Sequence, residues 1–436
     1  MSVPAPGSVR RTPLPPAPAP TVADSGELAW LTRTLWEGNG IEVHSGVPGS
    51  HARVLDGLGV LPSASRPRLL VPLGDRRAAA RALRDYPSSK SSVRLGTALL
   101  ALAMRAGHGE RVIRDRVTLS TGAELRAGGL ANVLLQEHLR VALGRADARV
   151  AVTFNAGRPQ KKPVLQVIGA DGDTIAYVKV GWNELTRSLV AHEASVLSCM
   201  QHDRPREFSV PQLRAAGPWR DLELLVISAA PDTYRRRRRR VLRRLPLAAT
   251  RELPRLGETS RTRLSASRFW RELRDALAAA LPWSADTSLA APALQTLEAV
   301  EARHGETLLT MGLCHGDWVP WNMGETAGSL HVWDWERSNP DSPHGLDAVH
   351  FLFQVQLNLL GRHPTEAVTR TLAQAAPVLR ELSVPERLAP VLLALHLLQM
   401  TLRLEQGRAG GIGGVIMGDL YAASLRALQA QRAVAW

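Results

Sequence analysis

The sequence has little cysteine and no long apolar segment. Its 436 residues include two cysteines, Cys199 and Cys314, too few for the disulfide framework of a small secreted protein and without metal-ligand spacing. No uninterrupted apolar run reaches the ~18 residues of a membrane span. The best candidate, residues 389–404, is broken by His396 and Arg403. The N-terminal segment also lacks the apolar core of a signal peptide, so we expect a cytoplasmic protein without a membrane span.

Acidic residues are fewer than basic ones. The chain carries 54 Lys and Arg against 40 Asp and Glu, a formal net charge of +14, which raises nucleic acid or an anionic membrane as possible partners. Most of the positive charge is arginine spread through Ala- and Leu-rich helical patterns. Residues 235–240 are six consecutive arginines, but no aromatic residues interleave with them as a single-strand binding surface would require. We therefore favour a solvated segment there and do not expect a nucleic-acid partner.

Composition and patterning divide the chain into four parts. Apolar residues make up 45% and charged residues 22%, values typical of globular proteins. Residues 1–25 are rich in Pro and Ala and are predicted to be a disordered tail. Residues 26–145 alternate helix and strand patterns, including a helix that begins after Asp75, and are interpreted as an α/β extension of unknown function. Residues 146–230 are richer in strand patterns, and residues 231–436 are mainly helical in pattern.

Residues 146–230 predict a small lobe that contains an antiparallel sheet. Three β-rich runs between 148 and 181 are separated by the loop 155–163 and a tight turn, which favours a three-stranded meander. A helix follows, and then two more strands around a Gly-Pro turn. Residues 231–436 have helical periods interrupted once, at 313–336. The predicted class is therefore α+β, with a sheet lobe and a helical lobe.

Polar residues concentrate in the interrupting segment, residues 313–336. His315, Asp317 and Asn322 precede a glycine-containing turn, and Asp334 and Glu336 follow the next apolar run. The pattern is typical of a hairpin, which would bring two carboxylates and an amide together. Hard oxygen ligands suit Mg²⁺ bound to phosphate, and a carboxylate free of metal could accept a proton from a hydroxyl. The segment therefore favours phosphoryl-transfer chemistry.

A lysine and a glutamate upstream complete this interpretation. Lys179 lies in the third apolar strand, and Glu193 falls on the apolar stripe of the next helix with Leu189 and Val196. An acid on a core-facing stripe needs a cation, and Lys179 is the natural candidate. Glu184 is the rival acid, but it stands at the helix start, where the dipole favours a carboxylate anyway.

At HGDWVPWN (315–322) and VWDWE (332–336) the sequence resembles the aminoglycoside phosphotransferase and choline kinase families, relatives of the protein kinases. The resemblance covers about residues 148–436 and implies a two-lobed protein-kinase-like fold with an extra N-terminal α/β extension. It also implies an ATP- or GTP-dependent phosphotransferase that uses Mg²⁺ and a hydroxyl acceptor. A small molecule is the expected acceptor, such as a sugar, an aminoglycoside-like compound or a biosynthetic intermediate; a peptide is possible.

The resemblance also implies roles for individual residues. Asp317 would be the catalytic base, Asn322 and Asp334 would bind Mg²⁺, and Lys179 with Glu193 would orient the phosphates. The supporting residues would be His315 and Asp347, which brace the loop or cap a helix, and Glu336, whose role stays open.

Nucleotide contacts are also implied at two further places. The loop 155–163 would cover the phosphates through Gly157 and Arg158, although it lacks a GxGxxG motif and fits an ordinary basic hairpin loop equally well. The backbone near Ala230 would hold the nucleotide base at the hinge between the lobes.

Other interpretations stay open at this point. A kinase-like scaffold could bind a ligand or peptide without catalysis. A metal-dependent hydrolase could use His315, Asp317, His331 and Asp334, but His331 is out of phase with Asp334 along the strand. Cys314 beside His315 could be a nucleophile, although a buried small residue is the commoner meaning. The arginine run favours a neutral or anionic acceptor over a polycation.

Overall fold

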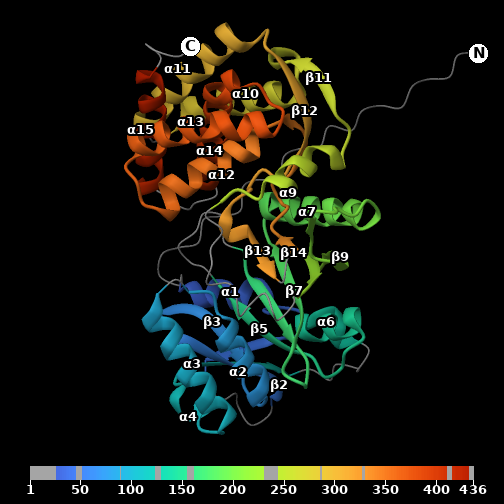
Figure 1. The fold of residues 1–436 in the computed structure, drawn as a ribbon. Coiled ribbons are helices and arrows are strands. Elements are labelled where there is room, and N and C mark those ends of the chain that lie inside the picture. Colours follow the sequence, from blue (N-terminus) through green and yellow to red (C-terminus); the bar gives the residue numbers. More distant parts are fainter. Residues whose placement is uncertain are drawn as a thin grey trace, which may run out of the picture.

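The computed structural model describes most of the chain in two lobes. The described residues are 26–45, 52–88, 90–122, 129–154, 162–229, 244–284, 287–326, 329–409 and 415–431. In Figure 1 the blue and green N-terminal half forms a lobe around one large sheet, and the yellow to red half forms a mainly helical lobe. The predicted α+β, two-lobed architecture is confirmed. The predicted disordered tail, residues 1–25, lies outside the described residues.

One antiparallel sheet of nine strands organises the small lobe. Its spatial order is β1-β4-β2-β3-β5-β6-β7-β10-β9, and every neighbouring pair runs antiparallel. The strands are β1 (Glu42–Ser45), β2 (Arg53–Ser63), β3 (Arg66–Pro72), β4 (Arg116–Thr121), β5 (Arg149–Thr153), β6 (Val164–Ile168), β7 (Thr174–Gly181), β9 (Leu213–Trp219) and β10 (Leu222–Ser228). The predicted meander β5-β6-β7 is present.

The N-terminal extension is part of this sheet. Its strand β3 pairs with β5 at Leu69↔Thr153 and Leu70↔Val152, so strands β1 to β4 continue the predicted meander outward. Side chains seal the same junction, because the ring of Trp30 from the extension stacks on Phe154 with centroids 5.3 Å apart. The extension contains both helices and strands, as expected, but shares the sheet and core of the lobe that follows it.

Helices cover both faces of the sheet. α1 (Glu27–Leu35), α5 (Leu130–Val133) and α6 (Leu135–Leu143) share a core with one face. On the other face α2 (Arg76–Asp85) packs over β3, β5 and β6, with α3 (Ser91–Arg105) and α4 (Gly109–Val112) outside it. Asp75 caps α2 as predicted, since its carboxylate accepts hydrogen bonds from two backbone amides at 3.0 Å each.

Helix α7 (Glu184–His202) packs on the far end of the sheet, over β7 and β10. Asn183 fixes its start, because its side chain accepts a 2.8 Å hydrogen bond from the Thr186 amide in a reciprocal capping box. The cap sets the helix so that Glu193 is fully buried against the sheet.

The turn between β9 and β10 differs from the prediction. It lies at Arg220, which has φ +53°, and Asp221, while Gly217 and Pro218 lie inside β9. β9 is the last strand of the sheet, where a proline can face outward without breaking a ladder hydrogen bond. The Gly-Pro pair therefore marks an edge strand.

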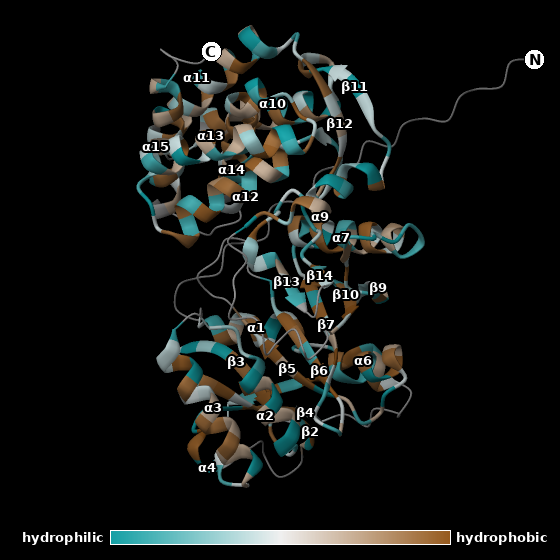
Figure 2. Cartoon of the chain, in the orientation of Figure 1, coloured by the Kyte–Doolittle hydropathy of each residue, from teal (hydrophilic) through white to brown (hydrophobic). Residues whose placement is uncertain are grey.

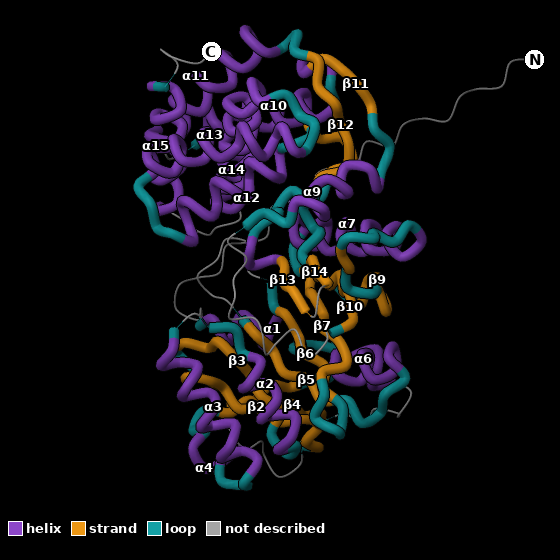
Figure 3. Tube along the Cα trace, in the orientation of Figure 1, coloured by secondary structure: helices purple, strands orange, loops and turns teal. Residues whose placement is uncertain are grey.

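Helices dominate the second lobe (Figure 3). They are α9 (Leu247–Glu252), α10 (Arg268–Ala280), α11 (Thr287–His304), α12 (Leu346–Gln354), α13 (Pro364–Glu381), α14 (Ala389–Ala409) and α15 (Val415–Ala430). A small sheet of β11 (Ser260–Arg263), β12 (Leu308–Cys314) and β15 (Asn339–Pro343) lies beside them. Helices α10 to α15 match the periods found in the sequence, because each buries its apolar side chains in one shared core.

The predicted hairpin of residues 313–336 is present. β13 (Met323–Thr326) and β14 (Ser329–Val332) pair antiparallel, and β14 also pairs in parallel with β8 (Phe208–Ser209) from the small-lobe segment. Its turn, residues 327–328, lies outside the described residues. The hairpin therefore connects directly to the chain that precedes β9.

The segment Glu386–Arg408, which includes most of α14, is long and apolar enough to cross a membrane by length and composition. Within the protein 72% of its apolar window is buried, and it forms the centre of the helical core. Core helices of this kind pass the same test, so its composition does not indicate a span.

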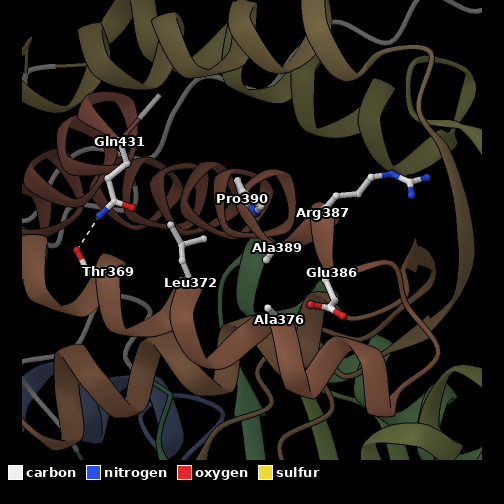
Figure 4. A pocket seen from close by; sticks show the side chains of 8 residues that line it. All are labelled: Thr369, Leu372, Ala376, Glu386, Arg387, Ala389, Pro390 and Gln431. Carbon is white, nitrogen blue, oxygen red and sulfur yellow. Dashed lines mark hydrogen bonds between the residues drawn. The ribbon is translucent and has the colours of Figure 1, made fainter. Parts of the chain in front are cut away.

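A cavity of about 530 Å³ opens beside α13 and α14. Figure 4 shows its lining, where the Gln431 amide donates a 2.6 Å hydrogen bond to the Thr369 hydroxyl beside Leu372 and Pro390. None of the predicted site residues lines this cavity, so we assign it no chemistry.

Candidate active site

A tight loop follows β12 and carries the histidine, glycine and aspartate. Gly316 has φ +75°, and a Cβ there would lie 2.1 Å from the Arg337 carbonyl oxygen, so only glycine fits. Asp347, in the first turn of α12, accepts hydrogen bonds from the backbone amides of His315 (2.7 Å) and Gly316 (3.0 Å). Asp347 therefore braces the loop, and the position before α12 is occupied by Gly345, whose φ is +89°.

His315 is held by both of its ring nitrogens. The Asp317 amide donates to Nδ1 at 3.1 Å, so the proton is on Nε2, which donates to the Trp333 carbonyl at 3.1 Å. Burial lowers the pKa of His315 to about 4, which keeps the ring neutral. With both nitrogens engaged, His315 is not available as a metal ligand. His331 instead hydrogen-bonds Ser209 on the neighbouring strand β8, so this geometry gives no support to the hydrolase alternative.

Asp317 presents a partly exposed carboxylate at the end of this loop. Its Oδ2 accepts a 2.7 Å hydrogen bond from the Asn322 amide, which also donates to its backbone carbonyl at 3.1 Å. Arg403 on α14 approaches Oδ1 to 4.0 Å and donates to the Gly316 carbonyl at 2.7 Å. Burial raises the pKa of Asp317 to about 6, against the opposing effect of Arg403. The sequence prediction missed Arg403, whose only signal was a charge inside an apolar helix.

Lys179 connects the two lobes. Its ammonium lies 2.8 and 2.6 Å from the Glu193 carboxylate oxygens and 2.6 Å from Oδ1 of Asp334. The structure brings Lys179 and Glu193 together as predicted, and Glu193 also accepts a 3.2 Å hydrogen bond from the Trp335 amide. Burial alone would lower the pKa of Lys179, but the charges of Asp334 and Glu193 outweigh it and raise that pKa.

Asp334 has an uncommon backbone conformation. Its φ is +74°, in the left-handed region that aspartate tolerates better than most side chains. Burial would raise the pKa of its carboxyl, but Lys179 and Lys162 hold it well below the usual range. Asp334 is therefore ionised at neutral pH.

Glu336 joins the same cluster. Oxygen atoms of Glu193, Asp334 and Glu336 lie within 4.8 Å of one another, the one group of this kind in the described part of the chain. Lys162 pairs with Glu336, a contact that sequence reasoning did not find. Asn322, predicted as a metal ligand beside Asp334, turns its amide nitrogen to Asp317, which leaves its oxygen as the atom that could face a cation.

Several predicted features lie outside the described residues or have ordinary structural explanations. Gly157, Arg158 and Ala230 are not among the described residues, nor are the arginines of 235–240. Burial raises the pKa of Cys314 to about 12, so the thiol stays protonated and its interpretation as a nucleophile has no support.

Two of the tryptophans near the site are packing residues. Trp318 and Trp335 are fully buried around Phe208, whereas Trp321 is 41% exposed. The buried pair therefore supports the loop from behind.

The chain is distantly similar to several proteins of known structure. The sequence matches no protein-family model and no curated protein. Among solved structures, the chain is similar to a thermostable mutant of aminoglycoside phosphotransferase APH(4)-Ia in its apo form, with 13% identity over 68% of this chain and 98% of that one and a TM-score of 0.47. Choline kinase LicA from Streptococcus pneumoniae gives 13% identity, the same coverages and a TM-score of 0.42.

A glucosamine kinase structure is similar over a longer stretch. It gives 15% identity over 95% of this chain and 100% of that chain, with a TM-score of 0.34.

Proposed function

We propose that the protein is a nucleotide- and Mg²⁺-dependent phosphotransferase that moves a phosphoryl group from ATP or GTP to a hydroxyl of a small molecule. The observation that carries this proposal is the position of Lys179, whose ammonium is shared by Glu193 and Asp334. Asp334 follows the hairpin of β13 and β14, and Asp317 lies on the loop that precedes this hairpin. A buried lysine fixed by a glutamate, next to an aspartate that could hold Mg²⁺, is an arrangement suited to binding nucleotide phosphates.

Lys179 would contact the phosphate oxygens, and Glu193 would keep it in place. Asp334 is 33% exposed and ionised, and together with Glu336 and the Asn322 amide oxygen it offers the hard ligands that Mg²⁺ prefers. When bound, Mg²⁺ would neutralise the charge that develops on the transferred phosphoryl group.

Asp317 would act as the general base. Its pKa of about 6 leaves it mostly ionised at neutral pH yet basic enough to accept a proton from a hydroxyl. The Asn322 amide fixes one carboxylate oxygen, and 29% exposure of the side chain leaves room for an acceptor. The brace from Asp347 to the loop backbone would hold this geometry through the reaction.

The charge beside Asp317 favours a neutral or anionic acceptor. Arg403 lies within 4.0 Å of its carboxylate, and burial lowers the pKa of His350, so that ring adds no charge at 3.5 Å. A polycation would meet the arginine directly, whereas a sugar or an anionic biosynthetic intermediate would not. A peptide hydroxyl is the other acceptor class to test.

A screen with labelled ATP and GTP against sugars, aminoglycosides and hydroxyl-bearing peptides tests the proposal. We expect Mg²⁺-dependent transfer to one class, lost in Asp317→Ala protein that still binds nucleotide. Nucleotide binding without transfer to any acceptor would instead support the catalytically silent scaffold. Transfer by folded Asp317→Ala protein would show that the assigned mechanism is wrong.

A further inference from the structure

Helix α3 exposes a row of leucines. Leu95, Leu99 and Leu102 are 63%, 60% and 66% exposed, although leucine is usually buried. They are separated by four and three positions, so they lie on one face of the helix. Val112 on the adjoining helix α4 is also 63% exposed. None of these side chains is covered by any described part of the protein.

The opposite side of α3 already has its partners. Ala101 and Met104 are buried in the core formed with α2 and β3. The outward leucines are therefore additional apolar surface. In Figure 1, α3 and α4 lie at the end of the small lobe away from the helical lobe, and Figure 2 shows that much of α3 is hydrophobic. Such a surface marks an interaction site.

Positive charge surrounds these leucines. Arg94 and Arg105 are eleven positions apart on α3, three helical turns, so both flank the leucine row on the same side. The cations between 90 and 116 are all exposed, namely Lys90, Arg94, Arg105, Arg111, Arg114 and Arg116. The same stretch contains two acids, Glu110 and Asp115, and the Asp115 carboxylate accepts a 2.6 Å hydrogen bond from the Ala64 amide.

We propose that α3 and α4 dock the protein peripherally onto an anionic phospholipid surface. The leucines would enter the boundary between headgroups and acyl chains, and the arginines beside them would contact lipid phosphates, as in interfacial amphipathic helices. A second copy of the chain is the poorer fit, because the same cations would face each other across a twofold axis. The inference is independent of the phosphotransferase proposal, since it uses none of the candidate active-site residues.

Co-sedimentation of the full-length protein with vesicles tests this. We expect binding to phosphatidylcholine vesicles that contain phosphatidylglycerol, little binding to phosphatidylcholine alone, and weakening by salt because the attraction is partly electrostatic. The double variant Leu95→Glu/Leu99→Glu should lower partitioning by about tenfold or more, since it removes apolar contact and adds repulsion. Arg94→Glu/Arg105→Glu should lower it as well.

Val141→Glu is the matched control, because this residue on α6 is 66% exposed and lies outside the proposed surface. It should bind vesicles like the wild type. Circular dichroism confirms that each variant is folded. Equal vesicle binding by the wild type and the leucine variant would overturn the proposal. So would a leucine-dependent dimer in sedimentation velocity without vesicle binding, which would assign the surface to self-association.

Discussion

The ammonium of Lys179 lies 2.6 Å from Oδ1 of Asp334, although the two residues are 155 positions apart. The lysine proposed to contact phosphate thus neutralises the carboxylate proposed to hold the metal ion. Glu193 binds the same ammonium from the other side. Binding of the proposed nucleotide and metal ion would have to redistribute these contacts.

Replacing Lys179 with Met should destabilise the protein as well as abolish nucleotide binding. The change leaves Glu193 fully buried without its cation, and breaking a buried ion pair from one side typically costs about 3–5 kcal/mol. Urea denaturation should show the loss as a lower midpoint. The double variant Lys179→Met/Glu193→Gln should recover part of the stability but no nucleotide binding. Full stability in the single variant would contradict the assigned pairing.

Replacing Asp317 with Asn should remove the base while keeping the shape of the site. We expect kcat to fall on the order of 10²- to 10⁴-fold, the usual contribution of general base catalysis. Nucleotide affinity measured by calorimetry should change little, because Asp317 would contact the acceptor. Asp171→Asn, an exposed aspartate in the β6–β7 turn, is the control and should have normal activity.

Activity should rise with pH as Asp317 ionises. Its pKa is raised to about 6, and only the deprotonated form accepts a proton, so kcat/KM should fall as pH decreases through 6 and level off above 7. Arg403 lowers the pKa of Asp317 by its charge, so Arg403→Met should move the acid limb to higher pH. An unchanged acid limb of the pH profile in this variant would contradict the inferred effect of Arg403 on the pKa of Asp317.

Alanine substitutions at two glycines distinguish the cost of backbone strain from the cost of a steric clash. Gly316 and Gly361 both have positive φ, which costs an alanine roughly 1–2 kcal/mol. A Cβ at Gly361 meets nothing within 4 Å, whereas one at Gly316 collides with the Arg337 carbonyl. Gly361→Ala should therefore cost only the strain, and Gly316→Ala should cost clearly more and reduce activity. Equal midpoints of thermal unfolding for the two variants would contradict the close approach of Gly316 to the Arg337 carbonyl.

Lys162 offers a test of the acidic cluster. Its charge opposes any cation near Asp334, and it pairs with Glu336. Replacing it with Met should strengthen binding of Mn²⁺ in the absence of nucleotide, measured by electron paramagnetic resonance, while weakening binding of the nucleotide. Lys90→Met, an exposed lysine before α3, should leave both affinities unchanged.

The features that the sequence predicted correctly depend on local patterns. The hairpin follows from glycines between two apolar runs, and the pair of Lys179 and Glu193 follows from an acid on the apolar stripe of one helix. Arg403 was missed because its contact with the loop depends on how α14 packs in the helical core, more than eighty positions along the chain from Gly316. A single charge in an apolar helix does not indicate its partner.

The largest difference between the sequence prediction and the structure concerns the N-terminal extension. Its helices were predicted from periodicity, but no local pattern shows that β3 pairs with β5, since strand pairing between distant segments is decided by the whole lobe. Nor does the sequence show that Asp334 shares the lysine with Glu193. Both contacts are between elements, and a single sequence contains no signal for either.

The pairing of β3 with β5 also limits how this protein can be shortened. A fragment that began near residue 146 would keep every candidate active-site residue, yet it would turn β5 into an edge strand with a row of unpaired backbone groups. It would also uncover Phe154, which Trp30 covers in the intact chain. The shortened protein would be prone to aggregation through that open edge, so the extension protects the sheet of the small lobe from pairing with other chains.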